Sequence, residues 1–133
     1  MKYLMKYRIF LENKDYQETS WTRKINGEDV TITIHDIQDY LKDEPVVDIL
    51  VYNIEDICIH KDKTDKETLE RAERSNLKHP IIICKSGEDW GMILDGHHRL
   101  KKAIGLKEQT IKAKILDLDN SPEEYQIMFS HTL

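Results

Sequence analysis

The sequence has no long hydrophobic run and no low-complexity segment. None of its 133 residues belongs to an uninterrupted apolar stretch of about 18 residues, the length that a membrane-spanning helix requires. The first ten residues include Lys2, Lys6 and Arg8, and these charges interrupt the apolar core that a secretory signal peptide needs. We therefore expect no membrane span and a cytoplasmic location.

Cysteine is also scarce. The two cysteines, Cys58 and Cys84, each lie in a short apolar run typical of a buried strand, residues 57–59 and 81–84. This arrangement excludes a disulfide framework, and the two cysteines do not have the spacing of a cysteine-based metal site. A buried thiol keeps a high pKa, which disfavours nucleophilic catalysis by Cys84.

The composition favours a single folded domain. Hydrophobic residues make up 39% of the chain and charged residues 34%, with a net charge of −5. A chain of this length buries roughly two-thirds of its unfolded surface, which is enough for one core. We expect one compact unit, in which residues 1–45 form an N-terminal strand, hairpin and helix extension and residues 46–133 form the main domain with a C-terminal helix.

The charges are distributed unevenly. Residues 11–56 carry twelve acidic side chains against four basic ones, a local balance of −8. Residues 95–114 carry six basic side chains against two acidic ones, a balance of +4. The acidic first half disfavours a general nucleic-acid coat, so DNA is a less favoured partner. The short basic segment suits a local ligand that carries phosphate.

Hydrophobic periodicity predicts an α+β fold with a mixed sheet and short helices. Asn26-Gly27 between two β-rich runs is a strong hairpin signal, and Thr64 with Glu67 fits a capping box. The hairpin could extend the sheet, cover a site or contact another subunit, and core packing is favoured for Trp21. The expected elements are a strand over 3–11, the hairpin over 21–34, a helix over 37–41, a strand over 46–51, a helix over 64–77, strands over 80–84 and 90–94, a helix from about residue 97 that ends with Gly105 in a left-handed conformation, a strand over 111–115, and a helix whose first residue is Pro122.

The segment with the strongest functional signal is the turn after the strand over 90–94. Its sequence, Asp-Gly-His-His-Arg over residues 95–99, joins a buried strand to a helix within two residues. The N–H groups of a first helical turn bind anions, and the guanidinium of Arg99 presents a planar fork of donors that fits a phosphate. We therefore predict an anion site, formed by Gly96, His98, Arg99 and Lys102.

A purely structural interpretation stays open for the same residues. Asp95 would then cap the helix, His98 would be a core histidine, and Arg99 would lie on a solvated face. The charge pattern argues against it, because a helix N-terminus disfavours cations unless an anion compensates. Zinc is disfavoured at His97 and His98, since adjacent helical residues point about 100° apart.

The Asp-Gly-His-His-Arg motif, with the apolar strand over 80–83 before it, resembles the ParB/sulfiredoxin superfamily over roughly residues 47–118. Within it, the ParB-like branch has Gly-Glu-Arg-Arg, of which this chain keeps Gly96 and Arg99. The sulfiredoxin branch has its catalytic cysteine where this chain has His97, which excludes sulfinic acid reduction. The free serine kinase branch has Asp-Gly-His-His-Arg, and this chain matches it in full.

Resemblance to the kinase branch implies roles for residues on both sides of the motif. The catalytic carboxylate would be Asp62, where that branch uses glutamate, and Asp95 would be a second carboxylate. Lys63 or Thr64 would lie near the phosphates, while His97 and His98 would join in neutralising the migrating phosphoryl group. That kinase family also carries a large additional domain, for which 133 residues leave no room.

We therefore predict a nucleotide-binding domain, with phosphoryl transfer or nucleotide hydrolysis as its reaction if it is an enzyme. The expected ligand is ATP, ADP or CTP, and Mg²⁺ would enter with it. The alternative is a non-catalytic ParB-like regulatory or DNA-associated module. A short domain of this kind suits a gene of a phage or mobile element, and no pattern in the sequence indicates an oligomeric state.

Overall fold

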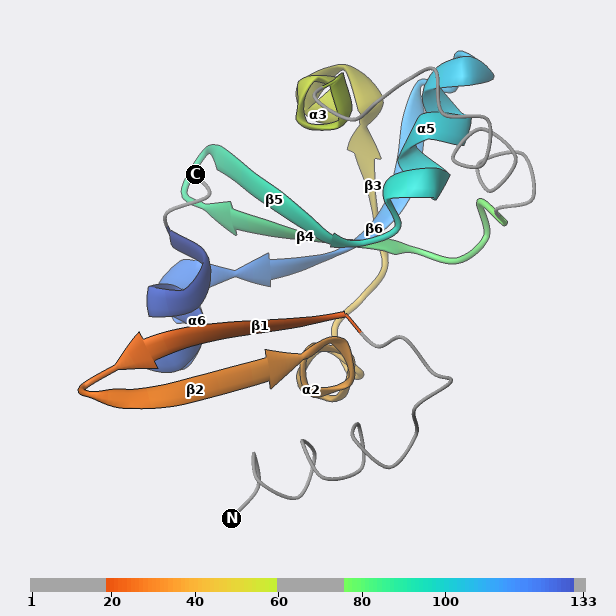
Figure 1. Ribbon diagram of the computed structural model, residues 1–133. Coiled ribbons are helices and arrows are strands. Elements are labelled where there is room, and N and C mark those ends of the chain that lie inside the picture. Colours follow the sequence, from red (N-terminus) through yellow and green to blue (C-terminus); the bar gives the residue numbers. More distant parts are fainter. Residues whose placement is uncertain (1–18, 60–75, 131–133) are drawn as a thin grey trace.

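The computed structural model describes residues 19–59 and 76–130 (Figure 1). The fold is α+β and contains two sheets, a two-stranded N-terminal hairpin and a four-stranded mixed sheet with short helices. The strand expected over 3–11 and most of the helix expected over 64–77 lie outside the described residues. Leu77, the predicted last residue of that helix, lies in a turn.

The larger sheet has the strand order β3-β6-β4-β5. Its members are β3 (Val47–Leu50), β6 (Thr110–Asp117), β4 (Ile81–Ser86) and β5 (Asp89–Asp95). The central pair, β4 and β6, is parallel, and both outer pairs are antiparallel. A central strand is covered on both faces, which explains why the first four residues of β4 are all apolar and all buried.

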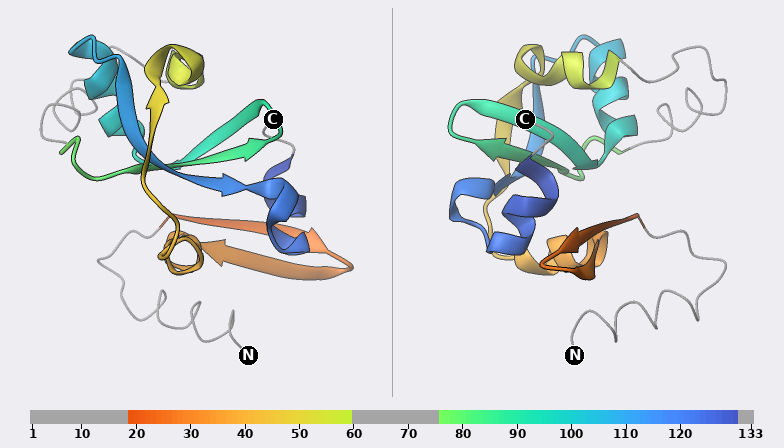
Figure 2. Two further views of the ribbon diagram at one scale, coloured as in Figure 1. Left: turned by 180° about the vertical axis from the view of Figure 1, so that it is seen from behind. Right: turned by 60° about the vertical axis from the view of Figure 1, so that its left-hand side comes forward.

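Helices cover both faces of this sheet (Figures 1 and 2). On one face, α3 (Val51–Ile59) and α5 (His97–Gly105) pack over Ile81 and Ile83. On the other face, Ile82 and Cys84 pack against α2 (Ile34–Tyr40), α6 (Glu123–Phe129), the hairpin and the short 3₁₀ helix η1 (Leu118–Asn120). Successive residues of β4 thus belong to different clusters, as the alternation of a strand requires.

The N-terminal hairpin forms as predicted. β1 (Ser20–Ile25) and β2 (Glu28–Thr33) pair in antiparallel register around Asn26-Gly27. Both turn residues have positive φ, 53° and 82°, as the tightest hairpin turns require. The hairpin is a sheet of its own and does not extend the larger one. Trp21 packs edge-on against Phe129 with ring centroids 5.2 Å apart, so its place is at the edge of the core.

The helix α2 starts earlier than the apolar spacing predicts. The sequence pattern predicts that the second hairpin strand runs to Ile34, but Ile34 is the first residue of α2. The reason is a capping box that the sequence analysis missed. The Thr33 hydroxyl accepts a hydrogen bond from the Asp36 backbone N–H at 3.1 Å, and the Asp36 carboxylate accepts one from the Thr33 backbone N–H at 2.8 Å.

Three other sequence-based expectations are wrong. The run over 57–59 belongs to helix α3, because Val51, Ile54 and Ile57 recur at helical spacing and pack into one cluster. Gly105 is the last residue of α5, and the left-handed residue beyond it is Lys107, with φ 58°. Pro122 is the N-cap of α6 and precedes its first helical residue.

Candidate functional site

The turn between β5 and α5 has a left-handed backbone at Gly96. This residue is the N-cap of α5 with φ 100° and ψ 24°, a conformation that glycine adopts without strain. A Cβ atom added there would lie 2.6 Å from Cγ2 of Ile81 and 3.0 Å from Nε of Arg99. Backbone and space both require glycine at this position, and the missing side chain lets Arg99 lie against the turn.

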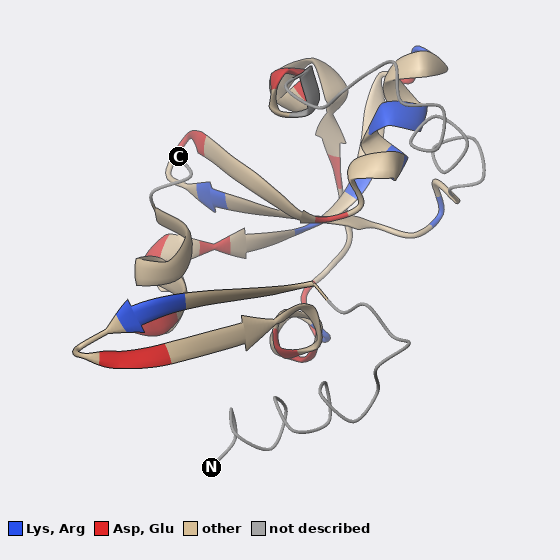
Figure 3. Ribbon diagram, viewed as in Figure 1, with Lys and Arg blue, Asp and Glu red and all other residues tan. Residues whose placement is uncertain are grey.

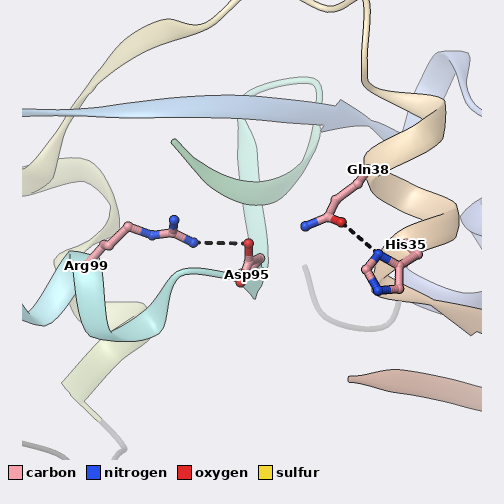
Figure 4. A network of polar contacts seen from close by, with 4 residues as sticks. All are labelled: His35, Gln38, Asp95 and Arg99. Carbon is pink, nitrogen blue, oxygen red and sulfur yellow. Dashed lines mark hydrogen bonds and ion pairs between the residues drawn. The ribbon is translucent and has the colours of Figure 1, made fainter. Parts of the chain in front are cut away.

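Helix α5 begins with a residue that has no side chain at its N-cap. Its first turn contains no acidic residue, and Gly96 makes no side-chain cap. The interpretation in which Asp95 caps the helix is wrong, because its Oδ2 accepts a hydrogen bond from Nη2 of Arg99 at 3.0 Å (Figure 4). This ion pair supplies a countercharge within the chain and relieves part of the conflict between the basic residues and the helix dipole.

In the Asp95–Arg99 ion pair, the arginine side chain is the less exposed partner. Its side chain is 17% exposed, against 38% for Asp95. A hydrogen bond in such a partly desolvated place is stronger than at an open surface. The contact with Asp95 uses one of the five N–H donors of the guanidinium group, and Arg99 also lines two cavities.

Two adjoining cavities share Asp95 and Arg99. The first, of about 200 Å³, is additionally lined by Asn76, Gly96 and His98. The second, of about 220 Å³, lies between the turn and helix α2, and its other lining residues are Gln38, Leu41, His79, Pro80, Ile82 and Lys114. The Asp95–Arg99 ion pair therefore stands where the two cavities meet.

Helix α2 forms one wall of the second cavity. The Gln38 Oε1 accepts a hydrogen bond from Nδ1 of His35 at 3.1 Å, and Figure 4 shows the amide nitrogen on the side of Asp95. Lys114 of β6 donates to the backbone oxygens of Leu41 and Lys42 at 2.9 and 3.2 Å and so fastens the end of α2 to the sheet. The sequence analysis missed Gln38 and Leu41, because no spacing rule links side chains more than about 50 positions from the motif.

The structure separates the residues that the motif analysis grouped. His98 lines the first cavity, whereas His97 and Lys102 line neither of the two cavities. The rotation of about 100° per residue along a helix explains why the two adjacent histidines do not share one cavity. Lys102 lies in the last turn of α5, where a cation interacts favourably with the helix dipole. Asp62, Lys63 and Thr64 lie outside the described residues.

The lysines and arginine of the segment over 95–114 are distributed over α5, the loop that follows it and β6 (Figure 3). Lys101 differs from the others, because its Nζ is buried and has no hydrogen-bond partner among the residues that the structure describes. Lys112 is exposed on β6 and approaches Asp48 only to 3.9 Å. Arg99 and Lys114 are the cations of this segment that line a cavity at the turn.

A larger cavity, of about 380 Å³, lies at the other end of β4 and β6. Its charged lining residues are Glu44, Lys85, Asp117 and Asp119, so carboxylates outnumber cations there. Asp119 accepts hydrogen bonds from the Ser86 hydroxyl at 2.6 Å and from the Gly87 N–H at 2.9 Å, which closes the adjacent turn. An anionic ligand fits this cavity less well than the smaller pair at Arg99.

The buried cysteine behaves as the sequence predicts. Cys84 is fully buried, and burial raises its thiol pKa to about 12. Tyr125, on the same face of the sheet, has its pKa raised to about 12, first by burial and then by the negative charges of Asp36 and Glu124. Both groups stay protonated near neutral pH, so neither acts as a nucleophile or base there.

No protein-family model matches the chain, and comparisons with curated proteins and with solved structures find no match either. Within residues 19–59 and 76–130, no three or more His, Cys, Asp and Glu side chains gather into a metal site. The helices in these ranges include none that is long and apolar enough to cross a membrane. The turn at Gly96 and its two cavities are the features of the described residues that suit a ligand best.

Proposed function

We propose that the chain binds a nucleotide at the turn over residues 95–102, with the phosphates against Gly96 and Arg99. The observation that carries this proposal is the position of Arg99, whose partly buried guanidinium borders both cavities. A planar fork of donors beside the N–H groups of an uncapped helix suits a phosphate group. His98 lines the first cavity and adds a further polar group beside the phosphates.

The proposal includes the fold family. A mixed sheet with a strand, the Asp-Gly-His-His-Arg turn and a helix supports a resemblance to the ParB/sulfiredoxin superfamily, with the motif closest to the free serine kinase branch. In a phosphoryl transfer of that kind, a carboxylate accepts the proton of the attacking hydroxyl while the bond from phosphorus to the leaving nucleotide breaks. Asp62 or Asp95 would be that carboxylate, Arg99 would neutralise the phosphoryl charge, and Mg²⁺ would enter bound to the phosphates.

The first test is binding. We expect that one of ATP, ADP, CTP or GTP, with Mg²⁺, raises the Tm of the wild-type protein. Ligand at 100 times its dissociation constant stabilises the folded state by about 2.7 kcal/mol, a shift of several degrees. We expect Arg99→Ala to abolish the shift. Lys112→Ala is the matched control, because it removes one positive charge of the same segment at a residue outside both cavities.

Two results would contradict nucleotide binding at this turn. The first is no shift with any nucleotide, and the second is equal shifts in the wild type and in Arg99→Ala. If binding is found, loss of turnover with retained binding in Asp62→Ala supports an enzyme. Binding without turnover in the wild type supports a regulatory module instead.

The alternative, a DNA-associated module, rests on the local charge of +4 over residues 95–114. It predicts an affinity for DNA that falls steeply with salt, because each neutralised phosphate releases counterions. The burial of the Lys101 Nζ and the pairing of Arg99 with Asp95 argue against a continuous DNA-binding face. An affinity for duplex DNA that Lys112→Ala and Arg99→Ala weaken equally would favour this alternative over the nucleotide.

A further inference from the structure

The two cavities that meet at Arg99 differ in chemistry. The first is bordered by Asn76, Gly96 and His98, which are polar or expose backbone. The second is lined by the apolar side chains of Leu41, Pro80 and Ile82, together with polar and charged groups that include Lys114. Of these two cavities, the second is therefore the one that offers apolar side chains to the flat ring of a nucleobase and polar groups to its hydrogen-bonding edge.

From this match we infer that the second cavity takes the nucleobase and that Gln38 reads its edge. The inference rests on the proposed nucleotide function and adds to it the part of the site that selects among nucleotides. A carboxamide offers both an acceptor and two donors, so it can pair with the mixed edge of a base. His35 holds the amide oxygen at 3.1 Å, which leaves the NH₂ group on the side of Asp95 (Figure 4).

The wall that carries Gln38 is held firmly by the core. Ile37 and Leu41, on either side of it, are 0% and 2% exposed and belong to one buried cluster. The capping box fixes the start of α2, and Lys114 fixes its end through two backbone oxygens. The helix backbone that carries Gln38 is thus held in place at both ends, which favours selective recognition by its side chain.

The sizes of the cavities support the same division. Pockets for drug-sized ligands usually measure about 300 to 1,000 Å³. The second cavity, at about 220 Å³, is too small for a whole nucleotide but large enough for one ring system. Arg99, which borders both cavities, then lies where the phosphates and the nucleoside meet. The residues that recognise the base thus come from the N-terminal part of the chain, which lies outside the motif.

The test separates the base from the phosphates. We would measure by calorimetry the dissociation constants of ATP, CTP, GTP and inorganic tripolyphosphate, each with Mg²⁺, for the wild type, Gln38→Ala, Gln38→Glu and Arg99→Ala. Gln109→Ala is the matched control, because Gln109 is exposed and lies in the loop before β6, outside both cavities. Gln38 is exposed on a helix, so its replacement by alanine keeps the fold.

We expect Gln38→Ala to weaken the preferred nucleotide roughly tenfold, the effect of losing about one hydrogen bond, and to leave tripolyphosphate unchanged. We expect Gln38→Glu to change the order of preference, because it replaces a donor with an acceptor. Arg99→Ala should weaken every ligand, and Gln109→Ala none.

Unchanged nucleotide affinities and order in both Gln38 variants would overturn the inference while leaving the proposed function in place. The same holds if the wild type binds tripolyphosphate and all nucleotides equally. If the wild type binds none of them, both the proposed function and the inference are overturned.

Discussion

Among the helices that follow a strand, α2 and α5 begin in opposite ways. α2 follows β2 and is closed by Thr33 and Asp36, which cap each other's backbone N–H groups and are 3% and 2% exposed. α5 follows β5 and begins at Gly96, with no side-chain cap and no acidic residue in its first turn. Gly96 and Arg99 hold the positions in α5 that Thr33 and Asp36 hold in α2.

This difference separates a structural helix start from a ligand-binding one. Every helix start has N–H groups without a partner in the helix. The side chains of α2 satisfy them, and that start is part of the core. At α5 the chain provides a glycine, a cation and two cavities, an arrangement that suits an external anion. Helix α2, whose start is capped, also contributes to the site at α5, because it forms one wall of the cavity beside Arg99.

The largest expected effect is at the open start. Gly96→Ala puts a Cβ atom 2.6 Å from Cγ2 of Ile81 at a residue with φ 100°, so backbone strain and overpacking add. We expect a loss of about 3 kcal/mol in the free energy of unfolding, measured by urea denaturation. Gly105→Ala is the control, because it has no neighbour within 4 Å and lies in the helix. Similar stabilities of the two variants would contradict this reading of the turn.

The closed start should respond less strongly. Thr33→Ala removes the hydroxyl that caps α2, and we expect a loss of about 1 to 2 kcal/mol in the free energy of unfolding. Thr33→Ser keeps the hydroxyl, so its free energy of unfolding should lie within about 0.5 kcal/mol of the wild-type value. Equal losses in both variants would show that packing of the Thr33 methyl group, and not capping, stabilises this start.

The smallest effect on stability is expected at the ion pair that joins the two cavities. Asp95→Asn removes the countercharge of Arg99, which should cost less than about 1 kcal/mol in the free energy of unfolding. The same change should tighten nucleotide binding roughly threefold at low salt, because it removes a negative charge beside the phosphates.

The matched control for the ion pair is Asp48→Asn. It removes one negative charge at a side chain that is 62% exposed and approaches Lys112 only to 3.9 Å. Equal affinities in the two variants, measured by calorimetry at the same ionic strength, would show that the charge of Asp95 does not act on the bound nucleotide.

Local sequence patterns predicted much of the fold. The hairpin over 21–34 follows from Asn26-Gly27, since a two-residue turn with positive φ is a local property of those residues. The strands β4 and β5 and the turn after them follow from their apolar runs and from Gly96. The start of α2 also had a local signal, because Thr33 with Asp36 three positions later fits a capping box.

Other elements depended on packing. The run over 57–59 fits a strand as well as a helix when it is read alone, and only the cluster with Val51 and Ile54 decides for the helix. The left-handed residue after α5 is Lys107 and not Gly105, because the helix continues through Gly105. Such long-range requirements override local propensity.

The sequence by itself determined the turn, since strand, glycine and helix are neighbours in the chain. It also placed His98 and Arg99 at the helix start. Only the tertiary structure decided that Arg99 pairs with Asp95, that His97 lines neither of the two cavities, and that Gln38, His79 and Lys114 border the site. The reason is that a cavity between elements far apart in the chain exists only once the sheet, α2 and α5 have packed together.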